Sequence, residues 1–290
     1  MDQLSVHRVR RLALRSLRKL GALRRLNLNV RLDVNGKAVV VPLRGQLGYA
    51  NVAGTEPWMI GLLTKLRPVY GGAFVDVGVN IGQTLIKAYS VFGKMTYVGF
   101  EPNPTCVAYC RELLELNDFG DAVVLPIGVS DDARVMKLNF FHKDAADPTA
   151  SIIERFRPDQ PIERQSYVSV FGSGHLGGVL PKNQSSFVKI DVEGGELEVI
   201  KGLSSWIANA RPLVLIEVLP VYRPDNEFRL RRQRELEAMF ASLGYRPARV
   251  VKKDGVGLTK LDEIGVHGDL EHCEYVFYPS ELEARVFDCF

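Results

Sequence analysis

Acidic side chains follow several short apolar runs of the chain, at points where such runs would end as strands. Asp76 lies in the run of residues 73–77, Glu101 ends the run of residues 96–101, and Asp191 lies at the end of the run of residues 187–192. The carboxyl ends of parallel strands meet at one edge of a sheet, so we expect these carboxylates to surround a common site. Carboxylates attract cations and accept protons, which indicates a site for a positively charged ligand or for acid–base chemistry.

A glycine loop follows the first of these runs, with the sequence Asp76-Val-Gly78-Val-Asn80-Ile-Gly82. Glycines at this place let a nucleotide-type ligand approach the backbone. A dinucleotide site would have the pattern G-x-G-x-x-G, whereas this loop has two glycines with an asparagine between them. Asp76, pointing into the site, would repel a pyrophosphate but attract the sulfonium and ammonium groups of S-adenosylmethionine. The loop therefore predicts binding of S-adenosylmethionine through Asp76, Gly78, Asn80 and Gly82.

Glu101 stands at the end of the second run, in the segment Phe-Glu-Pro-Asn-Pro of residues 100–104. A carboxylate at this strand end can accept hydrogen bonds from both hydroxyls of a ribose, as in other nucleoside-binding α/β folds. The simpler interpretation is that Gly78 only turns the chain and that Glu101 caps the following helix. Two acids on consecutive strands favour the cofactor site.

Asp191 ends a later apolar run, close to where an acceptor for a transferred group would lie. A carboxylate there can take the proton of an acceptor hydroxyl. For Glu193 three alternatives are open: it is the base in place of Asp191, it orients Asp191, or it only caps the helix that begins near Glu196. Lys189 has the same strand parity as Asp191 and is expected to pair with it, which lowers the pKa of Asp191, or to stabilise an alkoxide.

Two further side chains are candidates for this site. Glu217 is an acid in a buried strand and needs a partner there. His175, in the glycine-rich residues 172–178, is the one histidine that we consider as a base, although a loop histidine is commonly inert. Asp191, Glu193 and Glu217 together could hold a divalent cation, but no ligand spacing demands one, and we predict no metal.

Short apolar runs alternate with helical segments from residue 73 onward, which is typical of βαβ units and predicts a doubly wound α/β fold with a parallel sheet. The predicted strands are residues 73–77, 96–101, 122–127, 187–192 and 213–219. The predicted helices between them are residues 84–92, 105–117 and 196–202. Residues 131–185 interrupt this alternation of strands and helices: an extra strand is predicted at 135–141, followed by loops. A helix over 226–243 and antiparallel strands within 245–278 complete this part.

A β-hairpin is predicted over residues 30–41, because two β-prone runs are joined by Asn35-Gly36, the sequence of a type I′ turn. A helix over residues 56–66 follows, with Pro57 in its first turn. We divide the chain into a basic helix (1–27), a hairpin and helix (28–70) and a catalytic domain (71–290).

Residues 1–30 carry eight Arg and Lys against one acid, about +7, so the rest of the chain is about −4 from the total of +3. The pattern predicts an amphipathic helix over residues 4–25, which suits contact with an anionic membrane surface. Docking on its own domain or on a partner, and an organellar transit peptide, are the alternatives. A net-acidic body argues against a nucleic-acid partner.

The chain has 290 residues, 46% of them hydrophobic, enough for a sizeable core. Its four cysteines form no CxxC pair, and no run of 18 apolar residues or secretory signal occurs. These features predict a cytoplasmic protein in a reducing compartment, with peripheral contact at the inner face of the membrane as an option.

The chain resembles the FkbM family of methyltransferases over residues 55–220. Three segments carry the resemblance: the glycine loop, the Phe-Glu-Pro-Asn-Pro strand end, and Lys189-Ile-Asp-Val-Glu-Gly-Gly-Glu196. It implies a class I fold, S-adenosylmethionine as cofactor, and O-methylation of a hydroxyl, typically on a sugar, glycolipid or polyketide. Residues 127–131 resemble the third strand end of the family, near the adenine, so Ser130 and Asp131 join Asn103 as expected cofactor contacts.

The resemblance weakens before residue 185, where a Leu-Asp pair of the family is replaced by the segment Phe-Gly-Ser-Gly-His of residues 171–175. This leaves the wall that faces the acceptor undefined. We expect a saccharide or another small-molecule acceptor. Two rival functions are a non-catalytic nucleoside-binding scaffold, against which Asp191 and Glu193 speak, and an NAD-dependent oxidoreductase, against which Asp76 and the missing third glycine speak.

Overall fold

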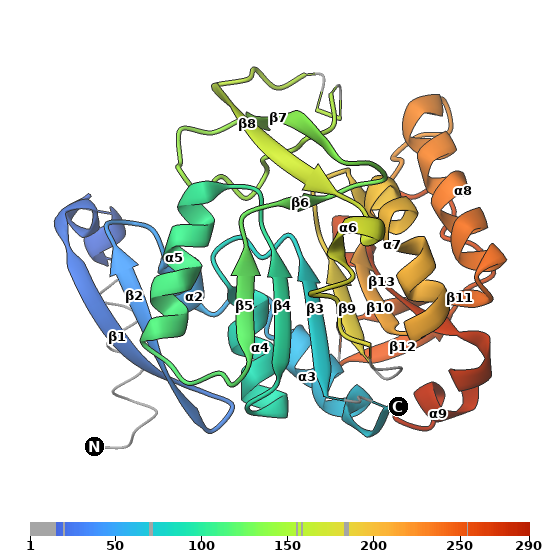
Figure 1. Cartoon of the computed structure of the whole chain (residues 1–290), viewed down its shortest axis with the longest axis horizontal. Helices are drawn as coiled ribbons and strands as arrows, with labels where there is room; N and C mark the ends of the chain where they lie inside the picture. The colour runs from blue at the N-terminus through green and yellow to red at the C-terminus, as the bar shows by residue number, and fades with distance from the viewer. Residues whose placement is uncertain are drawn as a thin grey trace.

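An eight-stranded sheet forms the centre of the molecule (Figure 1). The computed structural model describes residues 16–19, 21–69, 72–154, 156–157, 159–182, 186–253 and 255–290. The strands of this sheet are β3 (Ala73–Val77), β4 (Thr96–Phe100), β5 (Ala122–Leu125), β9 (Phe187–Ile190), β10 (Leu213–Glu217), β11 (Tyr245–Val251), β12 (Gly257–Lys260) and β13 (Glu274–Pro279). Their order is β12-β11-β13-β10-β9-β3-β4-β5. The five strands from β10 to β5 are parallel, and β13, β11 and β12 are added antiparallel.

Helices cover both faces of this sheet, which confirms the doubly wound prediction. The first face carries α3 (Trp58–Leu66), α4 (Gln83–Phe92) and α5 (Pro104–Glu115), and the second carries α6 (Ser173–Leu176), α7 (Glu196–Ala210) and α8 (Glu227–Ser242). Each face has its own apolar core. Since β3 and β9 are buried along their whole length, their sequences are nearly continuous apolar runs, as central parallel strands require.

Strand β3 distributes its side chains between the two cores by simple alternation. Phe74 packs in the first core, where its ring stacks on those of Tyr97 and Phe187. Val75 and Val77 pack in the second core. Asp76 has the parity of Phe74, which directs its side chain to the first face.

The predicted hairpin is present as β1 (Asn27–Val34) and β2 (Lys37–Arg44), longer than predicted at both ends. Asn35 and Gly36 both have positive φ, 53° and 79°, as a type I′ turn requires. The hairpin packs against α5, and Asn117 exchanges two side-chain hydrogen bonds with the backbone of Val40. A short helix, α2 (Tyr49–Ala53), leads from the hairpin to α3.

A second, three-stranded sheet lies over the carboxyl ends of the central strands (Figure 1). It consists of β6 (Gly128–Val129), β7 (Arg134–Phe140) and β8 (Arg164–Phe171) in the order β6-β8-β7. Strand β7 agrees with the strand predicted over 135–141. Strand β8 corrects the prediction of loops in this region: it pairs with β7 across more than twenty residues of chain, and local patterns do not reveal such a partner.

Helix α7 continues to Ala210, eight residues beyond the predicted end at Gly202. The glycine lies inside the helix because α7 passes close to the chain after β6. A Cβ atom on Gly202 would lie 2.0 Å from the carbonyl oxygen of Ser130. The glycine therefore permits close packing and does not end the helix.

The described end of the N-terminal segment lies on the body of the protein. Most of the helix predicted over 4–25, residues 1–15 and 20, falls outside the described residues. Residues 16–19 are helical, and η1 (Ala22–Arg25) follows. Leu17 packs against the first core, Leu23 is fully buried, and the guanidinium of Arg18 lies 4.5 Å from the ring centre of Tyr49.

The remaining short elements are η2 (Arg67–Val69), η3 (Leu270–His272), η4 (Ser280–Leu282) and α9 (Glu283–Phe287). Among the helices in the described part of the chain, none combines the length and the apolar character that crossing a bilayer demands.

Candidate active site

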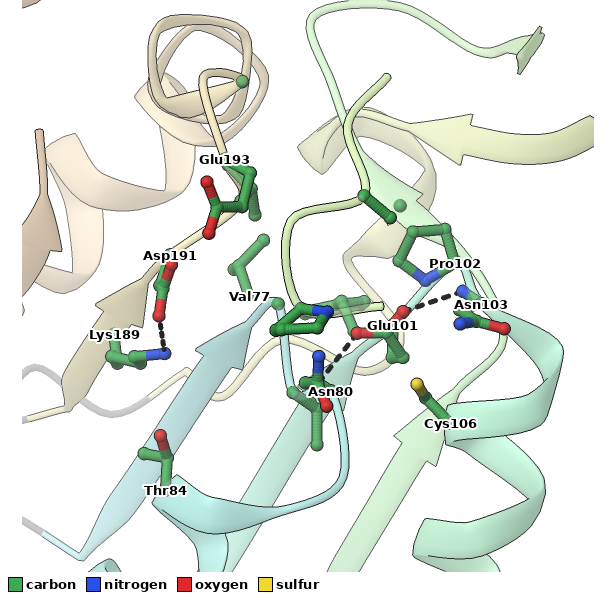
Figure 2. Close-up of a pocket in the computed structure, with 18 of the residues that line it drawn as sticks. Val77, Asn80, Thr84, Glu101, Pro102, Asn103, Cys106, Lys189, Asp191 and Glu193 are labelled. Atoms are coloured by element: carbon green, nitrogen blue, oxygen red, sulfur yellow. Dashed lines mark hydrogen bonds and ion pairs between the residues drawn. The ribbon is translucent and has the colours of Figure 1, made fainter. Parts of the chain in front are cut away.

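A cavity of about 370 Å³ opens at the carboxyl ends of β3, β4, β9 and β10. Its floor includes the glycine loop, and its roof comes from β7 and from the segment that joins β7 and β8. The roof residues are Leu138, Asp147, Pro148, Ala150 and Ile152. Glu101, Lys189, Asp191, Glu193 and Glu217 all line this cavity, so acids from three strand ends surround one space, as expected from the parallel sheet. Figure 2 shows Glu101, Lys189, Asp191 and Glu193 in this space.

The glycine loop is tightly held beneath the cavity. Gly78 has φ of +88°, and a Cβ atom there would lie 1.9 Å from the carbonyl oxygen of Asp191, so only glycine fits. Asn80 also has positive φ, 49°, a conformation that costs free energy for a residue with a side chain. Gly82 does not line the cavity; it precedes α4 and packs against Leu113 of α5.

Glu101 lies in the cavity wall with both carboxylate oxygens held by backbone. One accepts the N–H of Asn80 and the other the N–H of Asn103, each at 2.7 Å (Figure 2). Burial raises the pKa of Glu101 to about 7, although these two hydrogen bonds favour the ionised form. A carboxylate offers about four acceptor positions, so two are left for ribose hydroxyls. Glu101 therefore fits the predicted cofactor contact.

Asp76 does not point into the cavity, and this corrects the sequence-based prediction. Its side chain is fully buried on the first face of the sheet, where one oxygen accepts the hydroxyl of Tyr97. The other oxygen has no hydrogen-bond partner among the described residues. Burial raises the pKa of Asp76 to about 6, and the nearby ammonium of Lys189 acts in the opposite direction. Asp76 can influence a cation in the cavity only through its field.

Lys189, Asp191 and Glu217 form a linked group of ionisable side chains, in which Lys189 is buried and the two acids are partly buried. The Lys189 ammonium lies 2.8 Å from a carboxylate oxygen of Asp191, as the strand parity predicted. Glu217 hydrogen-bonds the same carboxylate, and burial together with the charge of Asp191 raises the pKa of Glu217 far above its ordinary value. Despite its burial, Asp191 has a lowered pKa, chiefly because of Lys189. Asp191 is therefore a stabilised carboxylate between a cation and a neutral carboxyl group.

Glu193 differs from Asp191 in both conformation and acidity. It occupies the left-handed region with φ of 54° and lies in the cavity wall. Burial and the charge of Asp191 raise the pKa of Glu193 to about 7, against the opposing effect of Arg157, whose guanidinium lies 2.5 Å from one carboxylate oxygen. A strained residue with such a pKa in a cavity is typical of a functional acid or base.

The segment after β7 holds the turn of Glu193 in place. Ser151 donates its hydroxyl to the carbonyl oxygen of Glu193 at 2.7 Å. The ring of Phe156 covers Gly194, where a Cβ atom would lie 2.5 Å from the ring. Arg229 of α8 donates to the carbonyl of Phe156 and places its guanidinium over the same ring. No local pattern indicates these contacts, since they join segments far apart in the chain.

Three other predicted site residues lie away from the cavity. His175 is exposed in α6, beside the ring of Phe171, and does not line the cavity, so it is not placed to act as a base. Ser130 is fully buried beneath α7 and bonds Asp131. Asp131 pairs with Arg134 at the surface. Their neighbours Gly128 and Val129 line the cavity instead.

Asn103 has a structural role besides its place in the cavity wall. Its side-chain oxygen caps α5 by accepting the N–H of Thr105, and its amide nitrogen donates to the carbonyl of Ala145 in the roof. Asp147 organises the roof from within, accepting the backbone N–H groups of Phe141, His142 and Thr149. Both residues shape the cavity without needing a ligand.

The strands of the central sheet can be renumbered from 1 in chain order, without the edge strand β12. From β5 to β11 their order across the sheet is then 3-2-1-4-5-7-6. This order, a glycine turn after the first strand and an acid after the second define a class I S-adenosylmethionine-dependent methyltransferase fold. Residues 76–247 match the model of the methyltransferase FkbM domain, more than half of the chain. The chain belongs to the FkbM methyltransferase family, and its cofactor is S-adenosylmethionine.

Several known proteins are similar to this chain. "Methyltransferase 1" of Beauveria bassiana is 21% identical over 142 residues, which are 44% of this chain and 57% of that protein. The FkbM methyltransferase structure from Methylobacillus flagellatus is 15% identical with a TM-score of 0.43, over 72% of this chain and 43% of that one. The SAH-bound methyltransferase PaMTH1 of Podospora anserina is 14% identical with a TM-score of 0.38, over 73% and 79% of the two chains.

Proposed function

We propose that this protein transfers the methyl group of S-adenosylmethionine to a hydroxyl oxygen, and that the acceptor is a saccharide or glycan. The observation that carries the proposal is Glu193, a carboxylate in the cavity wall whose pKa is raised to about 7. A hydroxyl must lose a proton as it is methylated, and a base with a pKa near neutrality suits this task. The cavity is acidic, which also suits a cationic methyl donor.

Residues of two strand ends would hold the cofactor. Glu101 would accept the ribose hydroxyls, and the loop from Gly78 to Asn80 would lie against the rest of the molecule. The bound cofactor supplies an electrophilic methyl group on a sulfonium. The chain supplies orientation, a roof that limits access of water, and a negative field to which Asp76 contributes from behind the wall.

Glu193 is the better candidate for the base, and Asp191 the better candidate for orienting the acceptor. Asp191 is ionised throughout the neutral range because Lys189 pairs with it, so its affinity for a proton is low. Glu193 pairs one oxygen with Arg157 and has a second oxygen for the acceptor. Its pKa lets it take a proton at neutral pH and release it afterwards.

The test is methyl transfer from isotopically labelled S-adenosylmethionine to panels of saccharides and glycolipids, with amines and carboxylic acids as competing classes. Label recovered in a saccharide as a methyl ether that resists mild alkali supports the proposal. Label found only as an N-methyl group or as an alkali-labile methyl ester contradicts it. Tight cofactor binding with no transfer to any class would support the scaffold alternative.

A further inference from the structure

A second cavity, of about 200 Å³, lies beside the first. Its wall is formed by the end of β1, the segment from α2 to α3, and the first turns of α4. Ala50, Thr55 and Gln83 line both cavities, so the two spaces share a wall. The second cavity therefore adjoins the space in which methyl transfer is proposed to occur.

Asn51 gives this cavity a buried hydrogen-bond acceptor without a partner. The residue is 8% exposed and lines the second cavity. Its amide nitrogen donates to the carbonyl of Ile81 at 2.7 Å and to the hydroxyl of Tyr109 at 3.3 Å. The amide oxygen has no hydrogen-bond partner among the described residues. An unpaired buried acceptor costs about 1–3 kcal/mol, and a small movement of the side chain toward the cavity would let a ligand O–H or N–H group satisfy it.

Lys87 gives the same cavity a buried donor with spare capacity. Its side chain is 6% exposed and its ammonium lies 2.6 Å from a carboxylate oxygen of Glu56. An ammonium has three N–H donors, and within the described residues Lys87 uses one of them, in its hydrogen bond to Glu56. Glu56 balances the charge, so the cavity has no need of an anion. A hydroxyl group both donates and accepts, and therefore suits Asn51 and Lys87 together.

The rest of the wall combines apolar residues with the polar residues Asp33, Asn35, Thr55 and Gln83, and it comes largely from the part of the chain that precedes the family match. The apolar residues are Leu32, Val34, Pro57, Ile60 and Ile86. Apolar side chains beside a few polar groups suit the C–H face of a hydroxylated ring. The family match begins at residue 76, so most of this wall is a feature of this chain beyond the shared cofactor fold.

We propose that the second cavity is an acceptor subsite, which binds a neutral hydroxylated ring next to the one that is methylated. This inference rests on the proposed function, since it assigns the unit that adjoins the reacting hydroxyl. It makes the N-terminal hairpin and the α2–α3 segment determinants of acceptor specificity. The chemical class of ligand is a neutral saccharide unit.

The test is nuclear magnetic resonance of the full chain with labelled isoleucine methyl groups, saturated with S-adenosylhomocysteine. Ile152 lines the first cavity and reports the cofactor, while Ile60 and Ile86 line the second. The probes are the methyl glycosides of glucose, galactose and mannose, with cyclohexanol as an apolar ring of similar size. We expect at least one glycoside to shift the Ile60 and Ile86 signals with saturable, millimolar affinity, and cyclohexanol to bind at least tenfold more weakly.

Three variants make the outcome specific. Val34→Trp fills the second cavity and should abolish the glycoside shifts while cofactor binding is unchanged. Leu28→Trp, on the same strand but outside the cavity, should keep them. Asn51→Leu should weaken glycoside binding at least tenfold.

Three results would overturn the subsite. The glycosides could leave the Ile60 and Ile86 signals unchanged in the cofactor-bound protein, cyclohexanol could bind as tightly as the glycosides, or the shifts could persist in Val34→Trp. Those results leave the proposed function standing. That function fails separately, if S-adenosylhomocysteine does not shift Ile152 or if labelled methyl groups reach no hydroxyl.

Discussion

Asp191 and Glu193 stand two residues apart, yet their surroundings give them opposite acid strengths. Lys189 pairs with Asp191 and lowers its pKa, whereas burial and the neighbouring charge of Asp191 raise the pKa of Glu193 to about 7. Two carboxyl groups whose pKa values are separated in this way can divide the tasks of orientation and proton transfer. This difference supports one assignment of the two roles that sequence patterns left open.

Glu193→Gln should lower the rate of methyl transfer by about 10²–10⁴-fold, because the amide cannot take a proton. The wild-type rate should rise with pH up to about 7 and then level off, since Glu193 acts as a base only when ionised. The measurement is the pH profile of kcat on a hydroxylated acceptor. Asp191→Asn is the comparison: it should lower the rate but keep the rise near pH 7. A Gln variant with the wild-type profile would contradict the assignment.

Glu101 should make binding of S-adenosylhomocysteine depend on pH. Its pKa is about 7 in the free protein, and the ionised form accepts ribose hydroxyls better, so affinity should increase between about pH 6 and pH 8. Calorimetry should show affinity about 10–100-fold weaker for Glu101→Gln, as expected for loss of hydrogen bonds to a charged group, with a flatter pH dependence. Identical pH dependence in both proteins would assign the effect to another residue.

The glycine turn after β3 shows how one element places several others. Gly78 permits close contact with the backbone of Asp191, and its N–H donates to the carbonyl of Phe100 at 2.9 Å. The turn thus joins the ends of β3, β4 and β9, whose residues form the cavity wall. Similar close packing occurs where α7 passes Ser130 at Gly202.

Gly78→Ala should destabilise the protein by more than about 1 kcal/mol and weaken cofactor binding, because an alanine is strained at this φ and its Cβ overlaps the carbonyl of Asp191. Gly174→Ala is the control, since Gly174 has an ordinary φ and no atom of the described residues lies within 4 Å of the point where an alanine Cβ would stand. Thermal unfolding and calorimetry measure both effects. Equal melting temperatures for the two variants would contradict the packing argument.

At the scale of the whole molecule, acids whose pKa values are raised by burial lie in the cavity wall and close behind it. Glu101, Glu193 and Glu196 each have a pKa raised to about 7 from an ordinary value of 4.5. The folded protein then holds more protons than the unfolded chain between these values, so its stability falls as pH rises through this window. Acids with lowered pKa values, such as Asp131 and Asp147, are ionised in both states near neutrality and add no slope there.

The free energy of unfolding of the ligand-free protein should therefore decrease between about pH 6 and pH 8. Glu101→Gln removes one of the titrating groups and should reduce this decrease by about 1 kcal/mol. Denaturant unfolding at both pH values measures the difference, and histidines contribute equally to the two proteins. Saturating S-adenosylhomocysteine should also reduce the decrease. If the free energy of unfolding of Glu101→Gln decreased more steeply with pH than that of the wild type, the pKa of Glu101 would not be raised in the folded protein.

Local chemistry allowed much of this architecture to be predicted. The apolar runs at 73–77 and 187–192 were predicted as strands and contain β3 and β9, and Asn35-Gly36 adopts the positive φ values of its turn type. Because parallel strands end at one edge of the sheet, the acids that follow them share a cavity. This could be predicted without knowing the order of the strands. These features depend on residues within a few positions of each other.

The tertiary structure decided how these residues act. Asp76 turns toward Tyr97 because strand parity directs it to the first face, and only the packing there shows that this places it behind the cavity wall. Arg157 reaches Glu193 from a segment 36 residues away in the chain, and β8 forms a strand by pairing with β7 and β6. Acid strengths and long-range partners depend on burial and charge in space, which spacing along the sequence does not specify.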